Sequence, residues 1–116
     1  MFKHLLLPLL LLTTGLTTAS GKDLTPALSQ GCAPCHGPDL NGVGGVFPSL
    51  MTSELVKSGN IEGVIQFITH GSPPDSNSLV KMPAKGGHLD LGDEEIHDIA
   101  KQVIELAKVY VCLLYT

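Results

Sequence analysis

Two cysteines and a histidine within five residues are the most informative feature of this 116-residue chain. They lie in the segment Cys32-Ala33-Pro34-Cys35-His36, and this spacing is typical of covalent c-type haem attachment. Two cysteines three residues apart can form thioether bonds to the two vinyl groups of one haem, and the adjoining histidine can bring a ring nitrogen to the iron. The motif therefore predicts that Cys32 and Cys35 bind haem c covalently and that His36 is an axial iron ligand.

Other uses of two close cysteines fit the chain less well. A thioredoxin-like redox pair requires a βαβ context, and no alternation of strand and helix patterns surrounds Cys32. A structural zinc site requires a second pair of ligands, but Cys112 is isolated in the sequence and the other histidines form no such pair. A disulfide between Cys32 and Cys35 would close a very small loop and would give His36 no role.

A haem iron bound by His36 has a sixth coordination position, and the sequence offers several side chains for it. The candidates are Met51, Met82, His70, His88 and His97. We expect Met51 to pack in the core and His97, beside Asp98, to be solvated. Met82 lies in a predicted loop directly before Pro83, where a methionine contributes little to core packing. Because methionine more often packs than binds metal, the residues alone leave this choice open.

The elements that must position these residues are predicted to be helices and long loops. Apolar residues recur at helical spacing over residues 61–69 and again after Asp93, whose first turn also carries Glu94 and Glu95. Asp23 or Thr25 is suited to cap a short first helix that leads into the attachment motif. The predicted helices cover residues 26–31, 52–57, 61–69 and 93 onward, with loops over 37–45 and 72–87. No useful length alternates with period two, so the sequence predicts an all-α domain.

The first residues have the layout of a secretory signal peptide. Lys3 and His4 form a basic start, an apolar run covers residues 5–12, and small residues precede a predicted cleavage site after Ala19. The apolar run is shorter than the roughly 20 residues that a membrane span needs. We therefore predict a signal peptide over residues 1–19 and a periplasmic or otherwise exported protein, with an uncleaved N-terminal anchor as the alternative.

The net charge argues against one class of partner. The formal charge is −4 at pH 7, and it becomes about −5 without the leader, which carries one lysine and no acidic residue. Nucleic-acid binding needs a basic surface that neutralises phosphates. The composition therefore excludes nucleic acid as a partner and predicts one small, monomeric domain.

The chain after the leader resembles a class I c-type cytochrome of bacterial type. The matching segments are a short helix into CAPCHG, a glycine-rich loop into Phe47-Pro48-Ser49-Leu50, the Met82-Pro83 loop, and a last helix that opens with GDEEI. The resemblance implies a small cytochrome c-like fold, in which short helices and large loops surround one haem. It also implies that Met82 is the sixth ligand and that the carbonyl of Pro48, twelve residues beyond His36, orients the imidazole.

Three features depart from that family or lie outside its pattern. The first helix has no aromatic residue to cross the last helix, and His70 stands where relatives often carry asparagine, which makes it a competing ligand along with His88. The end of the chain, residues 110–116, is apolar and holds the unpaired Cys112. We therefore set the cytochrome domain at residues 20–109 and treat 110–116 as an atypical tail, either native or derived from a sequencing adaptor or a truncation.

The predicted function is the transfer of single electrons between exported or membrane-bound redox proteins, without enzymatic activity. Two alternatives stay open at this stage. One is a haem enzyme or gas-binding protein with an open sixth position, and the other is a cytochrome subunit of a terminal oxidase or dehydrogenase complex. The donor and acceptor are unspecified, because Lys81 and Lys85 beside the ligand loop and the acidic start of the last helix are equally suited to docking.

Overall fold

Helices and loops make up the whole of the part of the chain that the computed structural model describes, residues 24–114. The elements are α1 (Pro26–Gly31), α2 (Ala33–His36), α3 (Glu54–Lys57), α4 (Ile61–His70), the 3-10 helix η1 (Ala84–Gly87) and α5 (Asp93–Leu114). Within these residues no strand forms, and an isolated bridge pairs Val43 with Phe47. The predicted all-α, cytochrome c-like fold is confirmed. None of the described helices is both long and apolar enough to cross a membrane.

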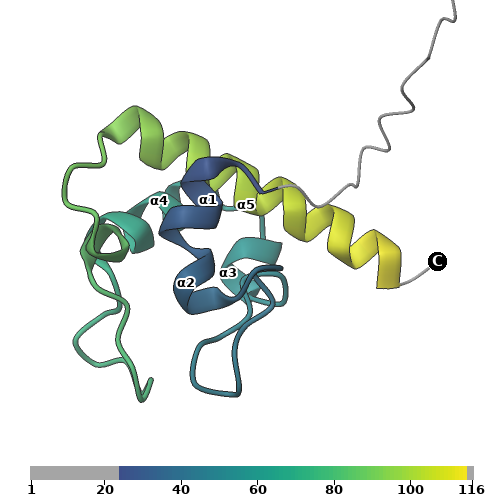
Figure 1. Ribbon diagram of the computed structural model, residues 1–116, viewed down its shortest axis with the longest axis horizontal. Coiled ribbons are helices and arrows are strands. Elements are labelled where there is room, and N and C mark those ends of the chain that lie inside the picture. Colours follow the sequence, from purple (N-terminus) through teal and green to yellow (C-terminus); the bar gives the residue numbers. More distant parts are fainter. Residues whose placement is uncertain (1–23, 115–116) are drawn as a thin grey trace, which may run out of the picture.

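The long helix α5 organises the other elements. Figure 1 shows α5 running across the molecule with the shorter helices alongside it, while the loops before α3 and after α4 extend at the edge away from α5. Helices α3 and α4 both pack against α5, and η1 packs against α4. The loop with Pro48 leads into α3, and the loop with Met82 follows α4. Both loops are therefore attached to helices that pack against α5.

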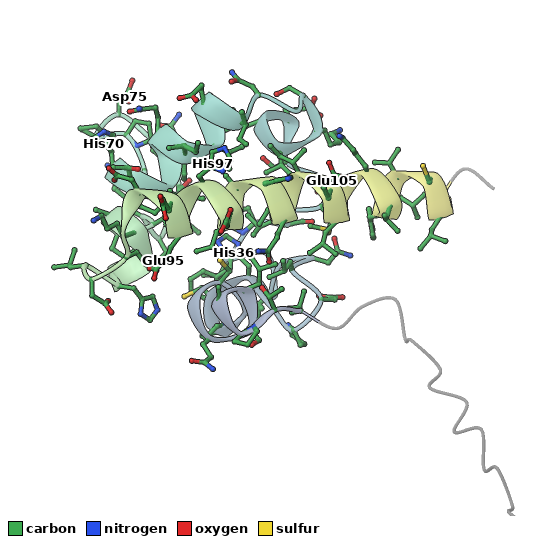
Figure 2. The ribbon with its side chains drawn as sticks, turned by 90° about the horizontal axis from the view of Figure 1, so that it is seen from above. His36, His70, Asp75, Glu95, His97 and Glu105 are labelled. Atoms are coloured by element: carbon green, nitrogen blue, oxygen red, sulfur yellow. The ribbon has the colours of Figure 1, made fainter. Side chains whose placement is uncertain are left out.

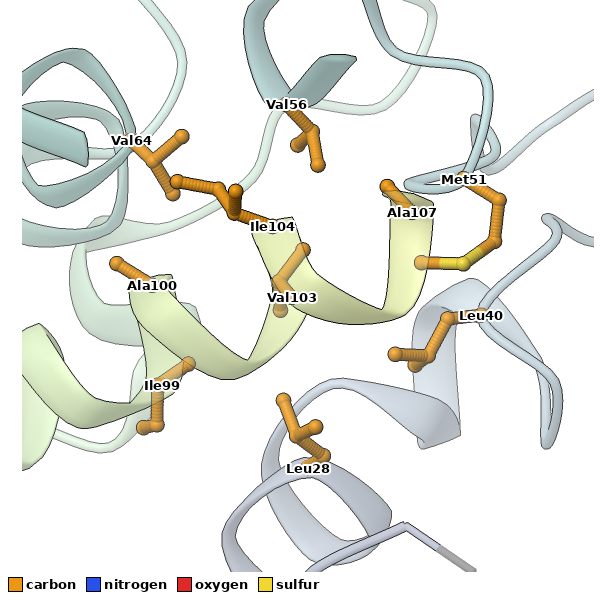
Figure 3. Close-up of a cluster of buried hydrophobic side chains, with 10 residues drawn as sticks. All are labelled: Leu28, Leu40, Met51, Val56, Val64, Ile99, Ala100, Val103, Ile104 and Ala107. Atoms are coloured by element: carbon orange, nitrogen blue, oxygen red, sulfur yellow. The ribbon is translucent and has the colours of Figure 1, made fainter. Parts of the chain in front are cut away.

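The core is built on one apolar stripe of α5. Its buried residues recur at the helical spacing expected after Asp93, namely Ile96, Ile99, Ala100, Val103, Ile104 and Ala107. Figure 3 shows side chains from α1, α3, α4 and the intervening loops converging on this stripe. Leu28 of α1 is 1% exposed and packs in the same core cluster. Each such fully buried aliphatic side chain contributes about 1.5–3 kcal/mol through removal of apolar surface from water.

The helix ends follow local sequence signals with one exception. The side chain of Asn60 caps α4 by accepting a hydrogen bond from the backbone N–H of Gly63 at 3.0 Å, and α4 is followed by Gly71, a residue type that is common just past a helix end. Thr25 stands at the N-cap of α1, but its side chain does not cap the helix. Its hydroxyl instead donates to Gln102 Oε1 at 2.6 Å, which ties α1 to α5.

The two predicted boundaries of the cytochrome domain lie at residues 19 and 109, and the described residues include only the second. The leader, residues 1–19, lies outside the described residues and stays a prediction. The helix α5 continues without a break through Leu114, past the predicted boundary at residue 109. Tyr110 is half-buried against the core cluster, so the helix keeps contact with the domain at least to this residue.

Candidate haem-binding site

The attachment motif folds as one tight helical turn, in which Cys32 follows α1 and the next four residues form α2. The backbone N–H groups of Cys35 and His36 both point to the carbonyl oxygen of Cys32, at 3.2 and 2.9 Å. Neither thiol of the motif is joined in a disulfide. Cys32 is half-buried beside the core and Cys35 is exposed. Burial raises the pKa of the Cys32 thiol, and the adjacent Cys35 adds to the increase. The turn thus holds two unpaired thiols next to one imidazole.

The imidazole of His36 is oriented by the loop that follows it. Its Nδ1 lies 2.8 Å from the carbonyl oxygen of Pro48. Because a carbonyl oxygen only accepts hydrogen bonds, Nδ1 donates, and the lone pair of Nε2 is left for a metal. This is the contact that the family resemblance implies for Pro48. The backbone N–H of Gly42 also donates to the His36 carbonyl oxygen at 2.8 Å, which holds the same loop to the motif.

A polar brace that the sequence analysis did not find holds the loop around Pro48. The hydroxyl of Ser49 donates to Asn41 Oδ1 at 2.7 Å, and Asn41 Nδ2 donates to the Tyr110 hydroxyl at 3.2 Å. The brace joins the two ends of the loop to each other and to α5. No sequence signal marks it, because Tyr110 lies 69 residues beyond Asn41.

Met82 lies in the loop between α4 and α5, as predicted. Its side chain is half-buried, and its terminal methyl lies 4.0 Å from the position that a Cβ on Gly86 would take, so it packs against η1. Its backbone is hydrogen-bonded to Ser72, directly after α4. Ser72 is a further residue whose role no sequence signal marks.

The competing ligand candidates occupy other surroundings. Met51 is 4% exposed within the core, and the His97 side chain is 54% exposed beside Asp98, both as expected. His70 is exposed at the end of α4, and Figure 2 shows it with Asp75 on the side of α5 away from His36. His88 is exposed, and its ring lies beside Gly31, the residue before the attachment motif.

The two lysines that flank Met82 are engaged within their own loop. Lys81 Nζ donates to the carbonyl oxygen of Pro74 at 2.5 Å, and Lys85 Nζ donates to that of Leu91 at 2.8 Å. These bonds give both ammonium groups a structural role in shaping the loop. The acidic residues at the start of α5 are exposed, namely Asp93, Glu94, Glu95 and Asp98.

The residues around the motif fit a haem group. The donor set comprises two thiols, an imidazole with a free Nε2 and a soft thioether, which are ligands suited to haem c. An open hollow of about 420 Å³ lies between residues 41–49 and Ser78–Leu79. The two loops also leave apolar side chains in water, including Leu79 at 91%, Val46 at 46% and Val80 at 44% exposed. Apolar surface on the loops that carry Pro48 and Met82 is suited to an apolar macrocycle.

Two comparisons with known sequences assign the chain to a family. Residues 18–101 match the family model described as cytochrome c oxidase, cbb3-type, subunit III. The chain is 32% identical over 80 residues to the cbb3-type cytochrome c oxidase subunit CcoP of Rhodobacter capsulatus, and the alignment covers 66% of this chain and 27% of that protein. The chain therefore spans about a quarter of the length of this relative. No solved structure is significantly similar to it. Because the family match covers most of its length, the chain belongs to the c-type cytochrome family of cbb3-type cytochrome c oxidase subunit III.

Proposed function

We propose that this chain transfers single electrons as the cytochrome part of a cbb3-type terminal oxidase. As a c-type cytochrome it carries covalently bound haem c, which supplies a one-electron iron couple. The observation that carries the proposal is the 2.8 Å contact between Nδ1 of His36, in the attachment motif, and the carbonyl oxygen of Pro48. Similarity to an oxidase subunit favours a lasting complex over a freely diffusing carrier.

Each residue of the site has a proposed role. Cys32 and Cys35 form the two thioether bonds, and His36 binds the iron through Nε2. Pro48 keeps the imidazole in the tautomer that leaves Nε2 free, and its hydrogen bond makes that nitrogen a stronger donor. Met82 would hold the iron through a neutral thioether, which would favour reduced iron and raise the potential relative to two imidazoles. With His36 and Met82 both holding the iron, the site would be suited to electron transfer rather than to binding a substrate.

The ligand assignment is tested with variants of the purified holoprotein. Met82→Ala is expected to abolish the sulfur-to-iron charge-transfer band of the oxidised protein and to lower the potential. Met51→Leu is the matched control, because it removes a thioether from the core while nearly conserving volume, and it should keep the band. His70→Ala should also keep it. An unchanged low-spin spectrum and potential in Met82→Ala would contradict the assignment.

The proposed complex and location are tested in the cell. We propose that residues 1–19 direct export and that the cytochrome domain begins at residue 20. Tagged protein recovered from solubilised membranes should co-purify with haem–copper oxidase subunits, and N-terminal sequencing should find the mature chain starting after Ala19. Elution of the tagged protein alone would support a diffusing electron carrier instead.

A further inference from the structure

Ser72 forms hydrogen bonds with both backbone polar groups of Met82, its N–H and its carbonyl oxygen. The Met82 N–H donates to Ser72 Oγ at 2.8 Å, and the Ser72 N–H donates to the Met82 carbonyl oxygen at 2.9 Å. The first bond is partly buried, and both residues are half-buried. Because a serine side chain and its own backbone bind the same residue, the position of Met82 is fixed relative to the end of α4.

Gly71 brings the two segments close enough for these two hydrogen bonds. It is buried and ends α4, with its N–H donating to the Phe67 carbonyl oxygen at 2.7 Å. Its Cα faces the Met82 loop so closely that a Cβ would overlap the Met82 carbonyl oxygen and lie 2.8 Å from Ala84 N. The rest of the loop is closed by Lys81 and Lys85, which bind backbone carbonyls outside this contact.

We propose that Gly71 and Ser72 are positioning residues that hold the Met82 thioether in place for the haem iron. The inference rests on the proposed function, since it assumes that Met82 is the sixth ligand. The Met82 side chain can leave the iron only if it rotates away within the closed loop or if the loop opens. Opening of the loop breaks both hydrogen bonds between Ser72 and Met82. These two bonds therefore oppose replacement of Met82 on the iron by water or by another ligand. Preorganisation of this kind keeps a ligand within its binding geometry.

Competition by an added ligand measures how strongly the two hydrogen bonds to Ser72 keep the Met82 loop closed. Oxidised holoprotein is titrated with imidazole, which displaces the Met82 thioether and removes its charge-transfer band. Ser72→Ala removes one of the two bonds, and loss of one such bond makes the open loop roughly fivefold more populated. We expect imidazole to bind Ser72→Ala about fivefold more tightly than the wild type. Ser72→Thr keeps the hydroxyl and should restore wild-type affinity.

A serine elsewhere in the same loop provides the matched control. Ser76 Oγ accepts from the Ser78 N–H at 3.3 Å and does not contact Met82. Ser76→Ala should bind imidazole as the wild type does. Equal imidazole affinity in Ser72→Ala and wild type would overturn the proposal, and so would a failure of Ser72→Thr to restore it.

Two further measurements keep the outcome independent of variant folding and of the ligand assignment. In wild-type holoprotein, native-state hydrogen exchange should show the Met82 amide protected relative to the Lys81 amide, for which the described residues offer no backbone hydrogen bond. Equal exchange rates of the two amides would overturn the proposal that Ser72 fixes the backbone of Met82, without the use of any variant. If Met82→Ala instead leaves the charge-transfer band intact, the ligand assignment fails, and that result is separate from the exchange pattern.

Discussion

Replacement of Gly71 by alanine is expected to destabilise the holoprotein by about 2–6 kcal/mol. Gly71 has φ +76° and ψ −165°, a backbone conformation that only glycine adopts readily and that costs other residues about 1–3 kcal/mol. The added Cβ would also overlap the Met82 carbonyl oxygen and lie 2.8 Å from the Pro83 carbonyl carbon. These are backbone atoms of a closed loop, so they cannot rotate away as a flexible side chain can. Overpacking of this kind costs about 1–3 kcal/mol more.

The control is Gly59→Ala, at the end of α3. Gly59 also has a positive φ, +71°, but no atom lies within 4 Å of the position of its Cβ. A left-handed backbone alone costs alanine about 1–2 kcal/mol, so Gly59→Ala isolates that part of the effect. Urea unfolding of both holoproteins, followed by helical circular dichroism, gives the two free energies of unfolding from midpoints at an unchanged slope. If Gly71→Ala loses no more stability than Gly59→Ala, the close packing of the Met82 loop on the end of α4 is refuted.

Three smaller predictions test other parts of the structure. Leu28→Ala should lower the free energy of unfolding by about 2–5 kcal/mol, because it leaves a cavity where α1 packs on α5. Urea unfolding measures the change, and a decrease no larger than that of a surface substitution would contradict this packing. Tyr110→Phe removes the hydroxyl that accepts from Asn41 and should cost about 0.5–1.5 kcal/mol in the same assay, whereas no loss would show that the brace adds nothing to stability. In haem-free chain at pH 8, iodoacetamide should label Cys35 faster than Cys32, because Cys35 is exposed and burial raises the pKa of the Cys32 thiol, leaving less thiolate. Peptide mass spectrometry measures the two rates, and the difference should vanish in urea; equal rates without urea would contradict it.

Local sequence signals were sufficient for α1, α3, α4 and α5 and for the attachment motif, whereas the 3-10 helix η1 falls within the predicted loop over residues 72–87. The stripe on α5 and the end of α4 at Gly71 follow from the 3.6-residue period and from the preference for glycine at a helix end, and both are local properties. The C-x-x-C-H spacing is equally local. The contact between His36 and Pro48 was implied only by resemblance to a family, because nothing in the loop itself directs a carbonyl toward the ring.

The polar contacts between distant segments were not predictable in this way. The Thr25 hydroxyl had two available roles, and the structure uses it to bind Gln102 rather than to cap α1. The partners Asn41 and Tyr110 have no shared period or motif. Lys85 has a left-handed backbone, φ 54°, which its residue type disfavours and which the bond of its ammonium group to the Leu91 carbonyl accompanies. Such contacts depend on how the helices place the loops, so they appear only after folding.

One loop holds Pro48, which contacts the proposed ligand His36, and the other holds the proposed ligand Met82. In both loops a serine hydroxyl forms a hydrogen bond that fixes the loop. In the first loop, the Ser49 hydroxyl joins Asn41, and Asn41 in turn reaches α5 through Tyr110. In the second, Ser72 fixes Met82 to the end of α4, which itself packs on α5. Side chains that bond to backbone or to other side chains thus replace the regular ladders that loops lack. Transfer of one electron requires the ligands to keep nearly the same geometry in both oxidation states, and a loop fastened at its ligand residue meets that requirement better than one fastened only at its ends. These contacts accordingly support the proposed transfer of electrons at this site.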